Sequence, residues 1–182
     1  MPSEQVKELL RKARSIALTE CECRAYYKRC DKPLEVCFLL DKAGDKFVEK
    51  GLARHITKKE TDDVLRKANE NGLVHLCLYM PDKKVYAVCS CCACCCHEFQ
   101  IVKQYQRRDL MVKSDYVAET NIQACIHCGA CAERCLFDAR HFKNSRLVFN
   151  AALCAGCGLC VTTCPAECTT LKPRRLKREN PY

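Results

Sequence analysis

The sequence has no tryptophan, and aromatic residues make up only 7% of its 182 positions. No apolar stretch approaches the roughly 18 residues that a membrane-spanning helix needs. Charged residues interrupt the first twenty positions throughout, so the apolar segment of a secretory signal is missing. We therefore expect a cytoplasmic protein without a membrane span. Its modest supply of large apolar side chains suggests that something besides apolar burial holds parts of it together.

Cysteine is the residue that the sequence has in excess, with 20 copies. A cytoplasmic chain keeps its thiols reduced, so dense cysteines there indicate metal or redox chemistry rather than disulfides. The run CSCCACCC at 89–96 supports this view. Adjacent α-carbons lie about 3.8 Å apart, which is less than the usual disulfide span of roughly 4.4–6.8 Å. These thiols are poor disulfide partners but a dense set of metal ligands.

The pattern of apolar and turn residues predicts an α+β protein with four segments. They are a cysteine-rich N-terminal domain with helices and a β-hairpin at 1–97, a connecting helix at 98–116, a second module at 117–172 and a basic tail at 173–182. Helical spacing predicts helices over 3–17, with Ser3 as its cap, and 98–114, and Thr57 with Glu60 forms a capping-box pattern at the start of another. Residues 73–80 and 85–89 are expected to be strands joined by a turn.

An internal repeat marks the second module, since CIHCGACAERC at 125–135 matches CAGCGLCVTTC at 154–164. Both runs have the spacing CxxCxxCxxxC, and the second is followed by proline. This spacing resembles that of bacterial-type ferredoxins with two 4Fe-4S clusters. The resemblance implies a module of two short β-hairpins and two short helices. Two zinc sites are the alternative, but the third and fourth cysteines of each run and the duplication argue against them.

The resemblance also implies crossed ligation, in which each run gives its fourth cysteine to the other cluster. Cluster one would take Cys125, Cys128, Cys131 and Cys164. Cluster two would take Cys154, Cys157, Cys160 and Cys135. Cys168 stands where the first repeat has Ala139, and we interpret it as a small buried residue rather than a ligand.

The N-terminal cysteines follow no ferredoxin spacing, although their order vaguely resembles that in ferredoxin-like proteins of anaerobes with an extra cysteine-rich domain. Ten are candidate ligands: Cys21, Cys23, Cys30, Cys37, Cys89, Cys91, Cys92, Cys94, Cys95 and Cys96. We favour one or two additional iron–sulfur clusters here, with Cys23, Cys30 and Cys37 supplying three ligands from one loop. A zinc or Cu(I) site and redox-active free thiols are the alternatives. Cys77 is expected in the core.

Charge and missing motifs narrow the function. The formal net charge is +9, and the basic tail suits docking onto an acidic surface of a redox partner protein. No nucleotide-binding glycine motif or catalytic triad stands out, so we expect no substrate turnover by this chain alone. The sequence favours low-potential one-electron transfer, as a free carrier or as a subunit of a larger redox complex. A redox-responsive regulator with a winged-helix-like N-terminal domain, or a metal or cluster carrier, is the alternative, and nucleic acid is not the expected partner.

Overall fold

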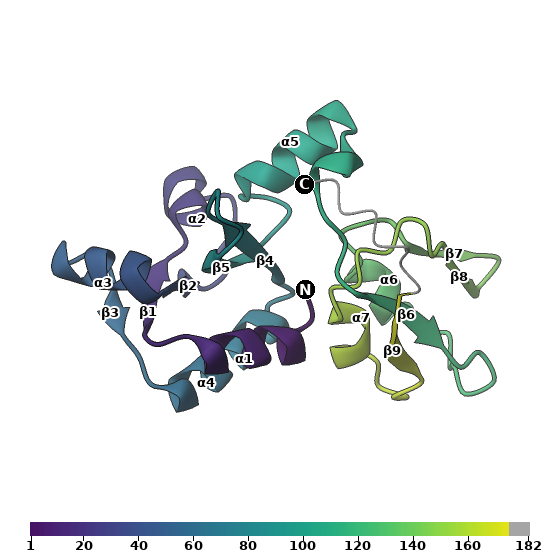
Figure 1. The fold of residues 1–182 in the computed structure, drawn as a ribbon. Coiled ribbons are helices and arrows are strands. Elements are labelled where there is room, and N and C mark those ends of the chain that lie inside the picture. Colours follow the sequence, from purple (N-terminus) through teal and green to yellow (C-terminus); the bar gives the residue numbers. More distant parts are fainter. Residues whose placement is uncertain (175–182) are drawn as a thin grey trace. The chain divides into compact units, whose positions relative to one another are not determined.

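A computed structural model describes residues 1–174, and the chain divides into two compact units (Figure 1). The first comprises Met1–Met111 and the second begins at Val112. Helices and antiparallel strands occur in both, which agrees with the expected α+β class. Most of the expected basic tail, residues 175–182, lies outside the described residues. No helix in the described part is long and apolar enough to cross a membrane.

The N-terminal unit is built on a five-stranded antiparallel sheet with the order β3-β1-β2-β5-β4. Its strands are β1 (Ile16–Glu20), β2 (Glu35–Leu40), β3 (Arg54–His55), β4 (Val74–Tyr79) and β5 (Val85–Cys91). The predicted hairpin is β4–β5, and β5 also pairs with β2. The hairpin therefore belongs to a larger sheet.

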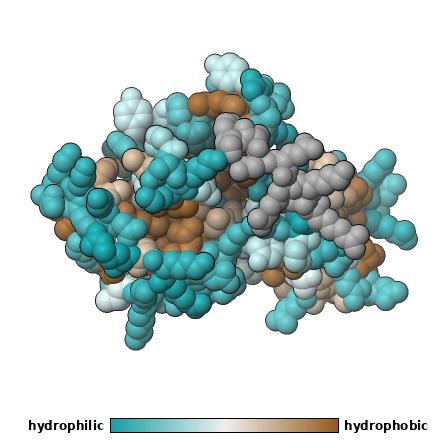
Figure 2. Space-filling model, in the orientation of Figure 1, coloured by the Kyte–Doolittle hydropathy of each residue, from teal (hydrophilic) through white to brown (hydrophobic). Residues whose placement is uncertain are grey.

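Two helices cover one face of this sheet, α1 (Ser3–Lys12) and α4 (Lys58–Glu70), which lie side by side (Figure 1). Their apolar sides meet the strands in a core that includes Val6, Leu10, Phe38, Leu65 and Val88. The other face is covered by α3 (Asp41–Glu49). In the view of Figure 2, hydrophilic residues cover much of this unit, as expected when the apolar sides of its helices face the sheet.

The first helix is shorter than predicted. It ends at Lys12, and the next residues form β1 instead of extending the helix to position 17. Ile16 and Leu18 are buried on one face of the sheet and Ala17 on the other, so pairing with β2 and β3 outweighs the helical periodicity.

The sequence predicts the caps of two helices, and the structure confirms one of them and contradicts the other. The capping box of α4 is confirmed, since Thr57 Oγ1 accepts from the Glu60 N–H at 3.2 Å and the Thr57 N–H donates to the Glu60 carboxylate at 2.8 Å. Ser3 does not cap α1, because Pro2 occupies that position. The Ser3 hydroxyl instead lies 3.0 Å from His75 Nε2 and accepts from Asn69.

The segment after β5 carries the cysteine run into α5 (His97–Tyr105) and a 3-10 turn at Arg108–Leu110. The connecting helix is therefore shorter than the predicted 98–114, and it ends where Gln106 takes a left-handed conformation with φ of 54°. The loop predicted at 19–37 contains a short helix, α2 (Glu22–Tyr27), before β2 begins.

The second unit has two small sheets and two short helices. Its elements are β6 (Tyr116–Thr120), α6 (Ala130–Glu133), β7 (Arg140–Lys143), β8 (Arg146–Phe149), α7 (Leu159–Thr162) and β9 (Thr169–Pro173). Only β7–β8 is one of the two predicted hairpins. The other sheet pairs β6 with β9, which lie at opposite ends of the unit's sequence. The Arg174 N–H continues this pairing by donating to the Asp115 carbonyl at 2.7 Å, and its side chain donates to the carbonyls of Tyr116 and Cys154.

Candidate metal and cluster sites

Two hollows in the second unit collect the cysteines of the repeated runs. One is lined by four of them: Cys125, Cys128, Cys131 and Cys164. The other is lined by the remaining four: Cys135, Cys154, Cys157 and Cys160. Each hollow therefore receives three thiols from one run and the fourth from the other run.

The local backbone explains this arrangement. Gly129 and Gly158 precede α6 and α7 with φ of 87° and 85°, a left-handed conformation that glycine adopts without a Cβ penalty. This turn starts each short helix within its cysteine run, so that the third cysteine is helical. The fourth cysteine follows the helix, where the chain has turned toward the other hollow. The Leu159 N–H also donates to the Cys157 thiol, the kind of bond that stabilises a bound thiolate.

Arg140 is buried beside both sets of thiols. It is 3% exposed, its Nη1 lies 3.6 Å from Cys131 Sγ, and its guanidinium stacks over Phe149 at 5.0 Å. Burial raises the pKa of the Cys160 thiol to about 12, and the positive charge of Arg140 acts in the opposite direction. Its Nη2 is buried without a hydrogen-bond partner among the described residues. A buried cation in this position favours negative charge in both hollows.

A fifth thiol lines the first hollow. Cys168 is buried, as expected, but its Sγ lies 3.5 Å from that of Cys164. Burial and the neighbouring Cys164 raise the pKa of Cys168 to about 11. His127, in the first cysteine run, is partly exposed, and its Nδ1 accepts from the Leu147 N–H. Its imidazole thus holds the β7–β8 hairpin against the first cysteine loop.

The N-terminal thiols form part of a second core in the first unit. Val36, Ala68 and Leu73 pack there with cysteines from the sequence's two N-terminal groups. The cysteines of this core are Cys21, Cys23, Cys30, Cys37, Cys89, Cys92, Cys94 and Cys95. Thiols therefore occupy positions that larger apolar side chains usually fill, which accounts for the modest apolar content of this half.

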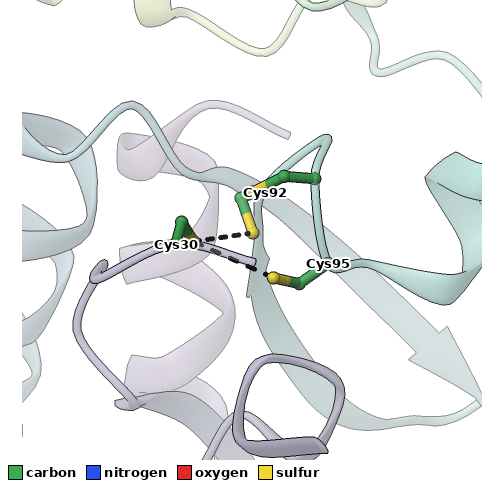
Figure 3. A group of neighbouring side chains, drawn as sticks. Cys30, Cys92 and Cys95 are labelled. Atoms are coloured by element: carbon green, nitrogen blue, oxygen red, sulfur yellow. Dashed lines mark hydrogen bonds between the residues drawn. The ribbon is translucent and has the colours of Figure 1, made fainter. Parts of the chain in front are cut away.

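Four of these thiols converge closely. The Sγ atoms of Cys30, Cys92, Cys94 and Cys95 all lie within 4.8 Å of one another, the one such group of possible metal ligands in the described residues. Cys30 comes from the loop after α2, and the other three come from the turn between β5 and α5 (Figure 3). The Sγ atom of Cys30 lies 3.9 Å from the Sγ atoms of both Cys92 and Cys95. Burial would raise the pKa of Cys92, but hydrogen bonds from Cys94, Arg24 and the Cys95 N–H lower it to about 6.

The remaining N-terminal candidate ligands form a second group, which we call the open thiol group because its thiols form a row and not a compact cluster. Their thiols are linked in a row through neighbouring contacts, Cys21 to Cys37, Cys37 to Cys89, Cys89 to Cys91 and Cys91 to Cys96. Cys23 lies nearby and accepts from the His97 N–H. Hydrogen bonds from Cys37 and Cys91 lower the pKa of Cys89 to about 5. The structure thus divides the three loop cysteines of the predicted site, since Cys30 joins one group while Cys37 and Cys23 join the other.

The side chains of Cys77 and His97 lie outside these groups. Cys77 is partly buried against the main core, and its thiol contacts Met1 Sδ at 3.7 Å. The His97 side chain is exposed. Arg24 and Arg140 were missed by sequence analysis. Several arginines lie in or near the cysteine-rich segments of the sequence. Only the fold shows that Arg24 and Arg140 are buried against thiols.

No protein-family model and no curated protein matches this chain. Thiols grouped in fours, with few competing oxygen or nitrogen ligands beside them, suit soft metal ions and iron–sulfur clusters.

Proposed function

We propose that this chain is an iron–sulfur electron-transfer protein whose second unit holds two 4Fe-4S clusters in the manner of bacterial-type ferredoxins. The observation that carries the proposal is the pair of hollows, each lined by four cysteines of the repeated runs, with one of the four contributed from the opposite run. This is the crossed arrangement that the spacing of the two runs implies.

The spacing of these thiols favours clusters over single ions. A single tetrahedral ion draws its four sulfurs close together, whereas a cluster keeps them apart because each thiolate binds a different iron. Among the described residues only the Cys30 group converges to within 4.8 Å, and none of the eight cysteines of the repeated runs belongs to it. They line hollows instead, which supports the larger cofactor.

The chain's own residues would set the conditions for electron transfer. A bound cluster supplies reversible one-electron chemistry at low potential. The cysteines would ligate it, while backbone donors such as the Leu159 N–H stabilise the thiolates and Arg140 offsets negative charge. For the N-terminal unit we propose one further iron–sulfur cluster at the open thiol group, which includes Cys21, Cys37, Cys89, Cys91 and Cys96.

The proposed partners are proteins that donate and accept electrons. The basic residues after position 174 would favour an acidic docking surface. The proposed role is that of a carrier or an electron-transfer subunit.

The test compares four variants of the full-length chain, each purified and reconstituted anaerobically. Cys131→Ser and Cys164→Ser should damage the same cluster and leave matching paramagnetic resonance spectra. Cys160→Ser and Cys135→Ser should leave the complementary spectrum. The control is Cys77→Ala, which should retain both signals because Cys77 lies in the other unit.

Two results would count against the proposal. A Cys164→Ser spectrum that matches Cys160→Ser would refute crossed ligation. A wild-type chain that binds no iron and sulfide in its second unit would refute the function itself.

A further inference from the structure

We infer that Cys30, Cys92, Cys94 and Cys95 bind a single tetrahedral metal ion, zinc in class, which is separate from any iron–sulfur cluster. A zinc–sulfur bond of about 2.3 Å places the four sulfurs of a tetrahedral site about 3.8 Å apart. The Sγ atom of Cys30 lies 3.9 Å from those of Cys92 and Cys95, and these three thiols point toward one another (Figure 3). All four thiols, with that of Cys94, lie within 4.8 Å of one another. This spacing fits one ion and is too tight for a cluster.

Arg24 supplies an independent observation that the site carries negative charge. The side chain is 1% exposed, so a permanently charged guanidinium is withdrawn from water. Its hydrogen bonds go to the carbonyls of Pro33 and Ser90 and, at 3.6 Å, to Cys92 Sγ. Its Nε is buried without a partner among the described residues. No carboxylate among the described residues forms an ion pair with this cation.

A zinc ion bound by four thiolates would supply negative charge beside the buried Arg24 guanidinium. Four thiolates around one divalent ion carry a net charge of about −2, which a buried arginine would partly offset. Neutral thiols would leave the guanidinium with only uncharged partners, and burying a cation in that state is costly. The position of Arg24 therefore favours bound thiolates over four free thiols.

The backbone around the site is arranged to hold an ion. The Cys96 N–H donates to the Cys92 carbonyl at 3.0 Å, which closes the turn that carries three of the ligands. The Gln100 side chain bonds to the Ala93 carbonyl, and Arg29 donates to the Cys94 carbonyl at 3.3 Å. The Cys95 N–H points at the Cys92 thiol, as expected where a CxxC turn wraps a metal.

Zinc is the ion that best matches this set of donors. Closed sites of four cysteines are typical of structural zinc, which has no redox chemistry of its own. The ion would join the loop after α2 to the turn before α5, two segments more than sixty residues apart, and its binding free energy would stabilise the fold. A site of this kind anchors the N-terminal unit, so electron transfer is left to the other thiol groups.

The experiment measures zinc, iron and sulfide in the full-length chain purified anaerobically. The wild-type chain should contain about one zinc, and its zinc-edge X-ray absorption should show four sulfur neighbours at about 2.3 Å. Cys30→Ser should lower the zinc content at least tenfold without lowering iron or sulfide. Cys77→Ser, the matched control, should leave zinc unchanged.

Arg24 gives a second test that does not remove a ligand. Arg24→Met should lower the affinity for zinc by roughly 10–100-fold in competition with a chelator, and Arg24→Lys should recover part of the loss because it retains the charge. If the Arg24 variants bind zinc as wild type does, the charge argument fails.

Other outcomes would overturn the inference while leaving the proposed function intact. Zinc that persists in Cys30→Ser, or three or fewer sulfur neighbours in the wild type, would place the ion elsewhere. A chain without zinc whose iron and sulfide both fall in Cys30→Ser would assign a cluster to this site. The absorption spectrum of the wild type decides the question even if a variant fails to fold.

Discussion

The two buried arginines carry much of the electrostatic argument. Arg24 and Arg140 are 1% and 3% exposed, and each has a guanidinium nitrogen 3.6 Å from a cysteine Sγ. A cation withdrawn from water stabilises negative charge beside it more strongly than a surface cation does, because solvent screens it less. In each unit, therefore, one buried arginine stabilises negative charge on the thiols beside it.

Arg140→Met should lower the reduction potential of the proposed clusters. Reduction adds negative charge, and the variant removes the cation that offsets it. An effect of roughly 1.4 kcal/mol would correspond to about 59 mV for one electron. Potentiometric titration followed by paramagnetic resonance measures this shift, with Arg146→Met as the control because Arg146 is exposed. If the reduction potentials stay constant or rise, the positive charge of Arg140 does not stabilise the reduced clusters.

At the level of helices and strands, local signals were reliable and long-range pairing was not. The capping box of α4 and the β4–β5 hairpin follow from neighbouring residues, so the sequence predicts them well. The end of α1 depends on β1 pairing with strands far along the chain, and β6 depends on β9. Likewise, the spacing of a cysteine run predicts that it binds a metal or a cluster. Only the fold shows that Cys30 meets the turn at 92–95 while Cys37 meets Cys21.

Gly156→Ala should destabilise the second unit and reduce its iron content. Gly156 has φ of 70°, and an added Cβ would lie 2.1 Å from the Tyr116 carbonyl oxygen and 2.2 Å from Ser114 Oγ. The left-handed conformation alone costs roughly 1–3 kcal/mol for a residue with a side chain, and the overlap adds to that cost. Because Gly156 lines the second hollow, the loss should be greatest for the cluster bound by Cys154, Cys157 and Cys160.

The chain offers a matched control for this prediction. Gly51 also has φ of 70°, but an added Cβ would meet nothing within 4 Å. Gly51→Ala should therefore show the conformational cost without the steric one. Thermal unfolding and iron content measure both variants, and equal effects from the two substitutions would contradict the close approach of β6 to the second cysteine run.

For the whole molecule, the structure describes two units that use thiols differently. In the second, cysteines line two hollows beneath short helices. In the first, a five-stranded sheet positions one tight group of four thiols and one open row. Much of the second N-terminal core consists of thiols, so bound metal would replace apolar packing there. Removal of metal should therefore unfold this core before the main core, which contains Val6, Val88 and residues of α1 and α4.

The most direct test of this account is the content of iron, sulfide and zinc per full-length chain after anaerobic purification. Two clusters in the second unit and one in the first predict about twelve iron atoms with an equal amount of sulfide, alongside about one zinc. A chain in which Cys131→Ser and Cys160→Ser together remove about eight of those iron atoms would match the account. A wild-type chain with zinc in place of iron and no acid-labile sulfide would contradict it.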